Sequence, residues 1–414
     1  MAQRPYGVLG RVLGHSYTPT IYRELDGMDY RRFEREPDQI QAFLSGDEWE
    51  GVNVTIPYKR TVMAYLDELS PLAKRMGNVN TITRLPDGRL RGDNTDYYGF
   101  KCLVEELNVD VSGKKALVFG GHGGAGTTAC MVLQDMGATV VPVSRKLEVT
   151  YDNLGTHKDA AIAVNCTPVG MFPHCPDKPC DLDELTELEA IIDAVYNPAR
   201  TGLMLEAERR GIPHISGLLM LVAQAAQAVE RYTGHAISLD RIRDVTSKLT
   251  NTEQNIALIG MPGSGKTRVG QNLAKMLGRD HIDIDAELER RLGCTCSDFI
   301  NKYGEAPFRK RETETLADIA SRSGLVLSTG GGVVTQDANY DLLHQNSIIV
   351  MLNRKLSELA KKNRPITARD GVEKLAAERM PRYRTWADII IDSRDCAEHT
   401  AAAIIGELPP MLDR

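Results

Sequence analysis

The chain has 414 residues, of which 42% are hydrophobic and 26% charged, and its formal net charge at pH 7 is −6. This length predicts two or three domains, and the acidic balance does not favour a nucleic-acid-binding protein. There is no apolar run of the length that predicts a membrane-spanning helix, and the first ten residues lack the apolar core of a signal peptide, so we expect a cytoplasmic protein.

The eight cysteines favour reduced thiols over a metal site. The most closely spaced pairs are Cys175 with Cys180 and Cys294 with Cys296. Neither spacing fits the paired ligands of a zinc site, so we expect no zinc.

Apolar, β-rich runs alternate with helical stretches along the chain, which predicts α/β layers with parallel sheets. Strands are predicted at residues 114–120, 138–144, 160–166, 255–260 and 347–352. A helix is predicted at 218–231. The polar stretch TSKLTNTEQN at 246–255 is interpreted as a linker, with a domain boundary near residue 252.

Two polar segments in the first hundred residues carry candidate chemistry. GVNVTIPYK (51–59) places Lys59 after a strand-like run, and GDNTDYYG (92–99) offers Asp96. In such a pair the aspartate orients the lysine, and the lysine passes a proton to or from a substrate oxygen as hydride moves. An ordinary surface lysine is the alternative, which spacing alone does not exclude.

The segment GHGGAG fits the pattern G-x-G-x-x-G between a predicted strand and a helical run, TTACMVLQDMG. In that context the glycines allow the backbone to approach a pyrophosphate at a helix N-terminus, which predicts a dinucleotide site. A plain glycine turn is the alternative. The residues of this predicted site are Gly121, Gly123, Gly124, Ala125 and Gly126.

The strand after this loop ends in Ser144, Arg145 and Lys146. NAD-binding proteins usually have an acidic residue here, which holds the ribose 2′-hydroxyl. Two cations suit a 2′-phosphate, so NADP is favoured over NAD. A solvated basic turn is the alternative.

The order of motifs over residues 5–245 resembles the shikimate dehydrogenase family. The matching segments are GHSYTP (14–19), NVTIPYK (53–59), GNVNTI (77–82), NTDYYG (94–99), NCTPVGM (165–171), DAVYNPARTGL (193–203) and GLLMLVAQAAQAVE (217–230). Thr18 replaces the usual second serine of the first motif and keeps its hydroxyl, while Val12 replaces a usual proline and puts only the local backbone shape in question.

The resemblance implies that Lys59 and Asp96 are the catalytic pair. It also implies a set of residues that contact the substrate: Ser16, Thr18, Thr55, Asn80, Tyr196 and Gln224. A third set would lie against the cofactor: Asn165, Thr167 and the backbone of Gly217.

A second glycine loop, GMPGSGKT (260–267), fits the P-loop pattern and lies between the predicted strand NIALI and the helical run RVGQNLAKMLG. Its backbone N–H groups would cradle phosphates, Lys266 would reach the β and γ oxygens, and Thr267 would bind Mg²⁺. The loop alone also suits a GTPase or a motor. Its remaining predicted nucleotide contacts are Gly263, Ser264 and Gly265.

Asp283 and Asp285 have the period-2 spacing of a strand, so both are expected to point to one side of a strand end. One would help to hold Mg²⁺, and the other would take a proton from a hydroxyl acceptor. A pair of exposed acids at a strand–helix junction is the alternative. Arg309 and Arg379 suit an anionic acceptor, with ordinary surface ion pairs as their alternative.

Residues 255–400 resemble shikimate kinase, through LIGMPGSGKTRVG, DIDAELE, GEAPFRKRE, STGGGVV, the Arg-Pro pair at 364–365 and RMPRYRTWAD. The resemblance implies a P-loop fold like that of nucleoside monophosphate kinases. It implies that Asp283 assists Mg²⁺, that Asp285 binds the acceptor hydroxyl and serves as a candidate base, and that Arg309 and Arg379 hold the shikimate carboxylate. The ring site would be lined by Gly330, Gly331 and Gly332.

The resemblance also implies that Arg364 is a lid arginine over the ATP phosphates. The segment 356–371 is short and lacks a further arginine that the family often has before Arg-Pro. Lys361 and Lys362 are candidates to replace it.

The sequence therefore predicts an α/β protein with a substrate-binding domain (1–103), a Rossmann NADP domain (104–250) whose last helix returns to the first domain, and a P-loop kinase domain (255–414). The predicted reactions are NADP-dependent reduction of 3-dehydroshikimate to shikimate, and ATP- and Mg²⁺-dependent phosphorylation of shikimate to shikimate 3-phosphate.

Two alternatives stay open. One is a dehydrogenase for quinate with NAD, which Arg145 and Lys146 disfavour. The other is a non-catalytic regulator, which is disfavoured because Lys59, Asp96 and the two kinase residues Lys266 and Asp285 are present. The sequence leaves open the oligomeric state, the orientation of the domains, substrate channelling and regulation.

Overall fold

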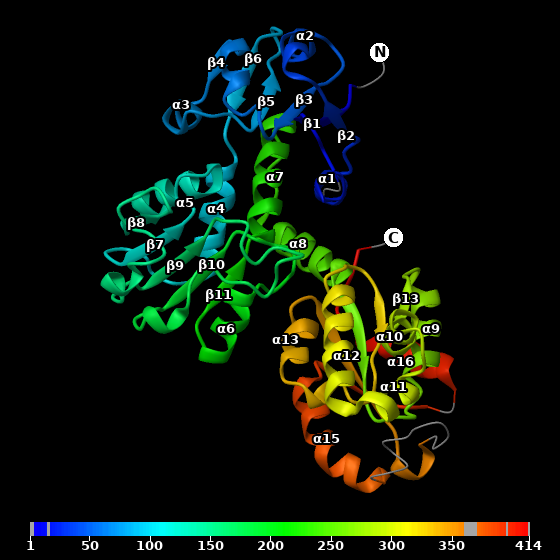
Figure 1. Ribbon diagram of the computed structural model, residues 1–414. Coiled ribbons are helices and arrows are strands. Elements are labelled where there is room, and N and C mark those ends of the chain that lie inside the picture. The colour runs from blue at the N-terminus through cyan, green and yellow to red at the C-terminus, as the bar shows by residue number, and fades with distance from the viewer. Residues whose placement is uncertain (1–3, 15–16, 360–370, 395, 413–414) are drawn as a thin grey trace. The chain divides into compact units, whose positions relative to one another are not determined.

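The computed structural model describes residues 4–14, 17–359, 371–394 and 396–412 (Figure 1). The chain forms two compact units. Unit 1 comprises Met1–Pro168, Pro179–Val195 and Ala207–Thr246, and unit 2 comprises Val169–Lys178, Tyr196–Glu206 and Ser247–Arg414. Helices α6 (Gly202–Arg210) and α8 (Leu239–Glu253) contribute residues to both units.

The first sheet of unit 1 has the strand order β2-β1-β3-β5-β6-β4. Its strands are β1 (Tyr6–Gly10), β2 (Tyr30–Glu34), β3 (Gly51–Val54), β4 (Glu68–Leu69), β5 (Thr81–Arg84) and β6 (Leu90–Asp93). The expectation of parallel sheets is wrong for part of this sheet, since β3 with β5 and β5 with β6 are antiparallel. The cause is local: the Leu85 N–H and the Arg89 carbonyl, 2.8 Å apart, close a hairpin around Gly88, which has φ +88°.

The second sheet of unit 1 is parallel throughout, with the order β11-β10-β9-β7-β8. Its strands are β7 (Lys115–Phe119), β8 (Thr139–Val143), β9 (Ile162–Asn165), β10 (Ala190–Asp193) and β11 (His214–Ser216). The strands predicted at 114–120, 138–144 and 160–166 are confirmed. The chain runs from β7 to β8 on one side and then to β9 on the other, so the strand order reverses at β7, where such folds bind ligands.

The remaining helices of unit 1 are α1 (Thr18–Asp26), α2 (Ile40–Ser45), α3 (Pro71–Met76), α4 (Asp96–Glu106), α5 (Gly124–Asp135) and α7 (Leu218–Thr233). The helix predicted at 218–231 is confirmed as α7. Its residues Leu218, Val222, Ala225 and Val229 recur at helical spacing and are buried. Gly99 of α4 lies so close to α7 that an added Cβ would be 2.6 Å from the Met220 carbonyl oxygen.

The sheet of unit 2 is also parallel, with the order β13-β14-β12-β15-β16. Its strands are β12 (Asn255–Ile259), β13 (His281–Asp283), β14 (Val326–Ser328), β15 (Ser347–Asn353) and β16 (Ile389–Asp392). The strands predicted at 255–260 and 347–352 are confirmed. The helices of this unit are α9 (Lys266–Leu277), α10 (Ile284–Leu292), α11 (Cys296–Tyr303), α12 (Glu305–Ala320), α13 (Ala338–His344), α15 (Val372–Trp386) and α16 (Ala397–Glu407).

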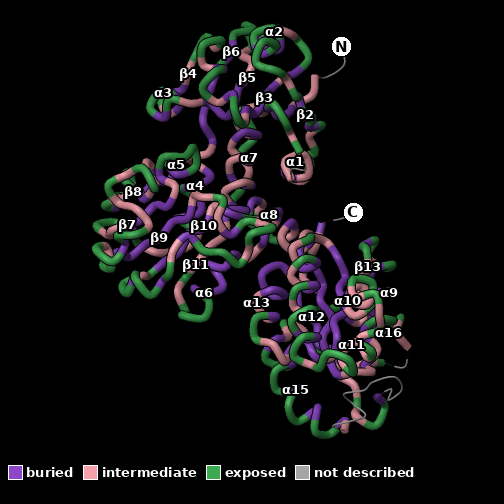
Figure 2. Tube along the Cα trace, in the orientation of Figure 1, coloured by how far each residue is buried: buried purple, intermediate pink, exposed green. Residues whose placement is uncertain are grey.

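Both faces of the unit 2 sheet are covered, because its central strands bury alternate residues on opposite sides (Figure 2). Ile256 and Leu258 of β12 belong to an apolar cluster with α9 and α16. Ala257 and Ile259 belong to a second cluster with α12, α13 and α15. Short 3-10 helices complete the described part of the chain: η1 (Pro37–Gln39), η2 (Thr61–Tyr65), η3 (Leu154–His157), η4 (Leu182–Glu184), η5 (Val333–Thr335) and η6 (Leu356–Glu358).

The polar stretch interpreted as a linker is folded, since residues 246–253 form the end of α8 and β12 begins at Asn255. Ile242, Val245 and Leu249 are buried at spacings of three and four residues. A few apolar residues at helical spacing are thus enough to bury one side of a helix whose sequence is otherwise mostly polar.

Across the described ranges no helix has both the length and the apolar character needed to cross a bilayer. All eight cysteines are free thiols.

Candidate active sites

The predicted acid–base pair of unit 1 is brought together by β3 and α4. Lys59 follows β3 after a turn in which the Tyr58 N–H donates to the Thr55 carbonyl at 2.9 Å. Asp96 is the first residue of α4, where the helix dipole favours a carboxylate. The Lys59 Nζ donates to the Asp96 Oδ2 at 2.5 Å, and the two side chains are 31% and 19% exposed. The pair is therefore accessible to a substrate and held by an ion pair.

Asn80 fixes the other oxygen of the Asp96 carboxylate. The Asn80 Nδ2 donates to Asp96 Oδ1 at 2.9 Å, and the Asn80 Oδ1 accepts the Thr95 backbone N–H at 2.8 Å. The Thr95 Oγ1 donates to the Gln224 Oε1 of α7 at 3.2 Å. Asn80 and Gln224 thus join the predicted catalytic pair in one network. Thr95, the link between them, was not predicted, although it stands beside Asp96 in the Asn-Thr-Asp motif.

The other predicted substrate contacts that the structure describes belong to different elements or loops of the fold. Thr55 directly follows β3 and donates its backbone N–H to the Leu9 carbonyl at 2.9 Å. Thr18 is the first residue of α1. Ser16 lies outside the described residues. Tyr196 belongs to unit 2, so its place at the substrate stays a prediction.

The first glycine loop joins β7 to α5. The Gly123 N–H donates to the Gly120 carbonyl at 2.9 Å, and α5 begins at Gly124. Gly126 lies directly against the Gly120 carbonyl oxygen, so a Cβ at this position has no room. Ala125 is an exposed residue of the first helical turn. The loop presents the free N–H groups of a helix N-terminus, as a pyrophosphate site requires.

Ser144, Arg145 and Lys146 follow the end of β8. The Lys146 N–H donates to the Ser144 Oγ at 3.3 Å. Arg145 and Lys146 are exposed, and neither forms an ion pair with another described residue. Their charges are accordingly available to an anion such as a 2′-phosphate.

Asn165 ends β9 beside the glycine loop. Its Nδ2 donates to the Asp193 Oδ1 at 2.9 Å, and its Oδ1 accepts the Thr167 Oγ1 hydroxyl at 2.7 Å. A Cβ on Gly120 would lie 3.0 Å from the Thr167 methyl carbon. Gly217 precedes α7 and has no room for a Cβ against the Ala194 carbonyl.

The second glycine loop connects β12 to α9. Gly263 and Gly265 have φ values of +88° and +96°, which other residues rarely adopt. The buried Lys266 folds back over the loop, with its Nζ donating to the Gly260 and Met261 carbonyls at 2.8 and 3.2 Å. The Ser264 N–H donates to the Met261 carbonyl at 3.1 Å. This closed loop has the form that cradles phosphates.

The predicted magnesium residues lie together. The Thr267 Oγ1 of α9 donates to the Asp283 Oδ2 at 2.6 Å. Asp283 ends β13 and caps α10, accepting the Ala286 N–H on its Oδ1 at 3.2 Å. A hydroxyl beside a carboxylate is the kind of oxygen donor set that suits Mg²⁺.

The expectation that Asp285 lies on a strand is wrong, because this residue belongs to the first turn of α10. Its carboxylate nevertheless reaches the Gly-Gly-Gly segment, where a Cβ on Gly330 would lie 2.6 Å from the Asp285 Oδ1 and 2.7 Å from the Glu312 Oε1. Burial raises the pKa of Asp285 to about 6, with the Glu312 and Asp283 carboxylates adding to the shift. The positive charges of Lys266 and Arg309 oppose it.

Arg309 and Glu312 form a buried ion pair on α12, with Nη1 and Oε2 2.7 Å apart. A second guanidinium nitrogen of Arg309 donates to Glu305 at 3.0 Å. The guanidinium lies against Gly332, where a Cβ has no room. Glu312 was not predicted, although its position three residues after Arg309 is the signal of a helical ion pair.

Arg379 and Tyr383 of α15 both reach the Gly331 carbonyl. The Arg379 Nη1 donates to it at 2.8 Å and the Tyr383 hydroxyl at 2.5 Å. Arg379 from α15 thus contacts Gly331, and Arg309 from α12 contacts Gly332. Tyr383 was not predicted, and Arg364, Lys361 and Lys362 lie outside the described residues.

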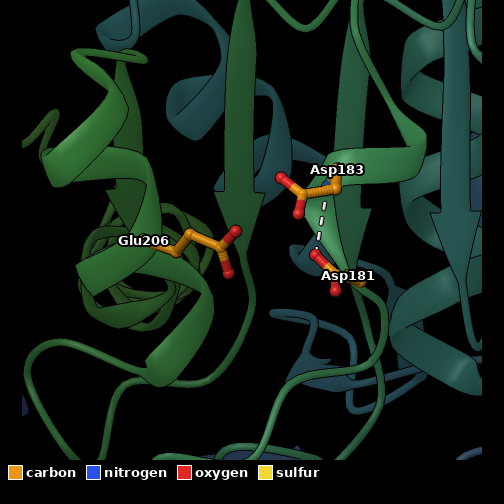
Figure 3. Close-up of side chains that lie close together, drawn as sticks. All are labelled: Asp181, Asp183 and Glu206. Carbon is orange, nitrogen blue, oxygen red and sulfur yellow. Dashed lines mark hydrogen bonds between the residues drawn. The ribbon is translucent and has the colours of Figure 1, made fainter.

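Another group of acids has ordinary partners. Asp181 caps η4, where its Oδ1 accepts the Asp183 N–H at 3.1 Å (Figure 3). Asp183 also pairs with Arg210 at 2.6 Å. Glu206, drawn in the same figure, pairs with Lys178. Asp183 and Glu206 therefore have ion-pair partners, and Asp181 has the role of a helix cap.

Two family models match the chain. Residues 8–82 match the shikimate dehydrogenase substrate binding domain, and residues 262–409 match shikimate kinase.

Curated relatives match the N-terminal part. The shikimate dehydrogenase (NADP(+)) of Methanothermobacter thermautotrophicus is 34% identical over 278 residues, which is 60% of this chain and 97% of the relative. That of Clostridium beijerinckii is 35% identical over 247 residues, covering 54% of this chain and 90% of the relative.

Solved structures match the same part. A chorismate mutase/shikimate 5-dehydrogenase fusion protein from Clostridium acetobutylicum is 31% identical, with a TM-score of 0.56, over 59% of this chain and 96% of that one. The shikimate 5-dehydrogenase of Thermus thermophilus, in complex with NADP(H) and shikimate, is 29% identical, with a TM-score of 0.53. The match covers 59% of this chain and 98% of that one.

Proposed function

Because the chain belongs to the shikimate dehydrogenase family and also carries a shikimate kinase domain, we propose that it catalyses two consecutive reactions. The first is the NADP-dependent reduction of 3-dehydroshikimate to shikimate, in domains 1–103 and 104–250. The second is the transfer of the γ-phosphoryl group of ATP to the 3-hydroxyl of shikimate, in domain 255–414. The observation that carries the proposal is the presence of both sets of chemical groups, the Lys59–Asp96 pair and the P-loop with Asp285.

In the first reaction Lys59 is the proton donor. Bound NADPH supplies a hydride to the carbonyl carbon. Lys59 gives a proton from its Nζ to the carbonyl oxygen, which becomes the new hydroxyl, and its 31% exposure lets solvent restore the proton. Asp96 orients the ammonium group through Oδ2 while Asn80 holds Oδ1 in place.

In the dinucleotide site the N-terminus of α5 would hold the pyrophosphate, and Arg145 and Lys146 would hold the 2′-phosphate. Their exposure and lack of ion-pair partners among the described residues support NADP over NAD. Relatives named as NADP(+) enzymes support the same cofactor.

In the second reaction Asp285 is the proposed base. When ionised it accepts the proton of the acceptor hydroxyl, and its position beside Gly330 places it at the edge of the glycine segment. Arg309 and Arg379 would hold the acceptor carboxylate with paired N–H groups. ATP supplies the phosphoryl group; Lys266 would bind its β and γ oxygens, and Thr267 with Asp283 would hold Mg²⁺.

A coupled assay tests the proposal directly. Purified protein is incubated with 3-dehydroshikimate, NADPH and Mg·ATP, and the products are separated. We expect NADPH oxidation and the formation of shikimate 3-phosphate. Absence of NADPH oxidation would contradict the first activity, and absence of phosphorylation when shikimate is supplied directly would contradict the second.

We propose small molecules as the substrates and no nucleic-acid partner, in keeping with the net charge of −6. A cytoplasmic location is proposed because all eight cysteines are free thiols, as in a reducing compartment.

A further inference from the structure

Arg354 lies beside the phosphate-binding loop, although no kinase motif of the sequence includes it. It directly follows β15, which pairs with β12 in parallel, so the end of β15 is next to the loop that follows β12. A Cβ on Gly260 would lie 2.7 Å from the Leu352 carbonyl oxygen. A Cβ on Gly265 would lie 4.0 Å from the Arg354 Nη1. The guanidinium therefore lies at van der Waals distance from the place that a Gly265 side chain would occupy, beside the loop.

The charge of Arg354 is weakly compensated by its neighbours. In the described part of the chain its ion-pair partner is Glu358 of η6, at 3.6 Å, which is longer than a hydrogen bond. The Arg354 Nε is buried without a hydrogen-bond partner. The Nε atoms of Arg309 and Arg379 are buried without a partner as well. Those two arginines differ from Arg354 in that each has another guanidinium nitrogen within 2.8 Å of an acceptor. A buried, unpaired N–H on a cation costs free energy that an anion at this place would recover.

We propose that Arg354 binds the polyphosphate chain of ATP at the second glycine loop, as a nucleotide-binding residue of the kinase. Gly265 is the N-cap of α9, so its surroundings are where backbone N–H groups and the helix dipole attract phosphate oxygens. The guanidinium adds a fixed charge with paired N–H donors on that side of the loop. The acceptor is held by other residues, namely Asp285, Arg309 and Arg379. The inference rests on the proposed kinase function.

The test compares Arg354→Gln and Arg354→Lys with the unchanged full-length chain. Calorimetry measures the affinity for Mg·ADP and for inorganic triphosphate, and steady-state assays measure KM for ATP and for shikimate. For Arg354→Gln we expect about tenfold weaker binding of both phosphate ligands and a similar rise in KM for ATP, the loss of one charge-assisted contact. KM for shikimate should be unchanged, and Arg354→Lys should give intermediate affinities.

Glu358→Gln provides a second, independent variant. The exposed Glu358 is the anion that competes for Arg354, so its neutralisation should strengthen Mg·ADP binding by about twofold. Arg311→Gln is the matched control, because this arginine is exposed on α12 and paired with Glu314 at 2.8 Å. It should change neither affinity.

Wild-type affinity for Mg·ADP in a folded Arg354→Gln chain would overturn the proposal, as would weaker binding by Glu358→Gln. Thermal unfolding of each variant establishes that it is folded. If the unchanged chain binds Mg·ADP but does not phosphorylate shikimate, the proposed kinase reaction fails, while the binding measurements still decide the role of Arg354.

Discussion

The Nζ of Lys59 and the Oδ2 of Asp96 lie 2.5 Å apart, although the two residues are 37 positions apart in the chain. One follows a strand and the other begins a helix, and Asn80 anchors the second carboxylate oxygen. The aspartate therefore has one oxygen for positioning and one for the lysine. Because Asn80 holds the carboxylate in place, the Asp96 Oδ2 can hold the Lys59 ammonium group in one position, from which it can exchange a proton with a substrate.

Removal of the Lys59 amine should stop the dehydrogenase and spare the kinase. For Lys59→Ala we expect NADPH oxidation with 3-dehydroshikimate to fall about 10²- to 10⁴-fold, the usual contribution of a proton donor. Phosphorylation of added shikimate should continue, since the P-loop and Asp285 belong to unit 2. Lys101→Ala, at an exposed helical ion pair, is the control. Loss of both activities in a folded Lys59→Ala chain would contradict independent sites.

Asp285→Asn should have the reverse effect. Phosphorylation should fall by several orders of magnitude while NADPH oxidation stays at the wild-type rate. In the unchanged chain, kcat of the kinase should decrease about tenfold per pH unit below about pH 6, because only the ionised form of Asp285 accepts a proton. A kinase rate independent of pH between 5 and 8 would exclude Asp285 as the base.

The same substitution should stabilise the fold at alkaline pH. Because the pKa of Asp285 is raised to about 6, the folded state binds its proton more tightly than the unfolded state. The ionised carboxylate therefore costs stability above pH 6, and that cost disappears as the pH falls toward 4. By calorimetry, Asp285→Asn should be about 1–3 kcal/mol more stable than wild type at pH 8, with a smaller difference at pH 5. A less stable variant at pH 8 would contradict this assignment.

Glu312→Gln should lower the pKa of Asp285, since the Glu312 carboxylate contributes to its rise. The acid limb of the kinase kcat profile should move to lower pH. Stability should fall by about 1–3 kcal/mol, because the buried Arg309 loses the more buried of its two charged partners and keeps Glu305. Glu314→Gln, which removes an exposed partner of Arg311 on the same helix, should change neither measurement. An unmoved pH profile would show that Glu312 does not affect Asp285.

Arg145 and Lys146 should determine the cofactor. The double change Arg145→Ala with Lys146→Ala should raise KM for NADP⁺ about 10- to 100-fold through lost charge-assisted contacts, and leave KM for NAD⁺ unchanged. Lys158→Ala, at another exposed lysine of the same unit, is the control. A wild-type preference for NAD⁺ would favour the quinate alternative.

Several features were predictable because they depend on residues close together in the sequence. The buried strands of the two parallel sheets appear as short apolar runs, and each glycine loop stands between a strand and a helix. Such local patterns predict both the secondary structure and the positions of the nucleotide sites. The antiparallel hairpin of β5 and β6 has a local signal too, in the Pro-Asp-Gly turn at 86–88.

The sequence by itself determined the α/β class, the two glycine loops and the identity of the reactive groups, because residue type and short-range spacing decide these. Tertiary structure alone decided which groups meet. It placed Asp285 in a helix while bringing it to Gly330, and it added Glu312, Tyr383 and Arg354 to the kinase site. Distance, burial and like-charge neighbours set the pKa of Asp285, and those quantities arise only when segments far apart in the chain pack together.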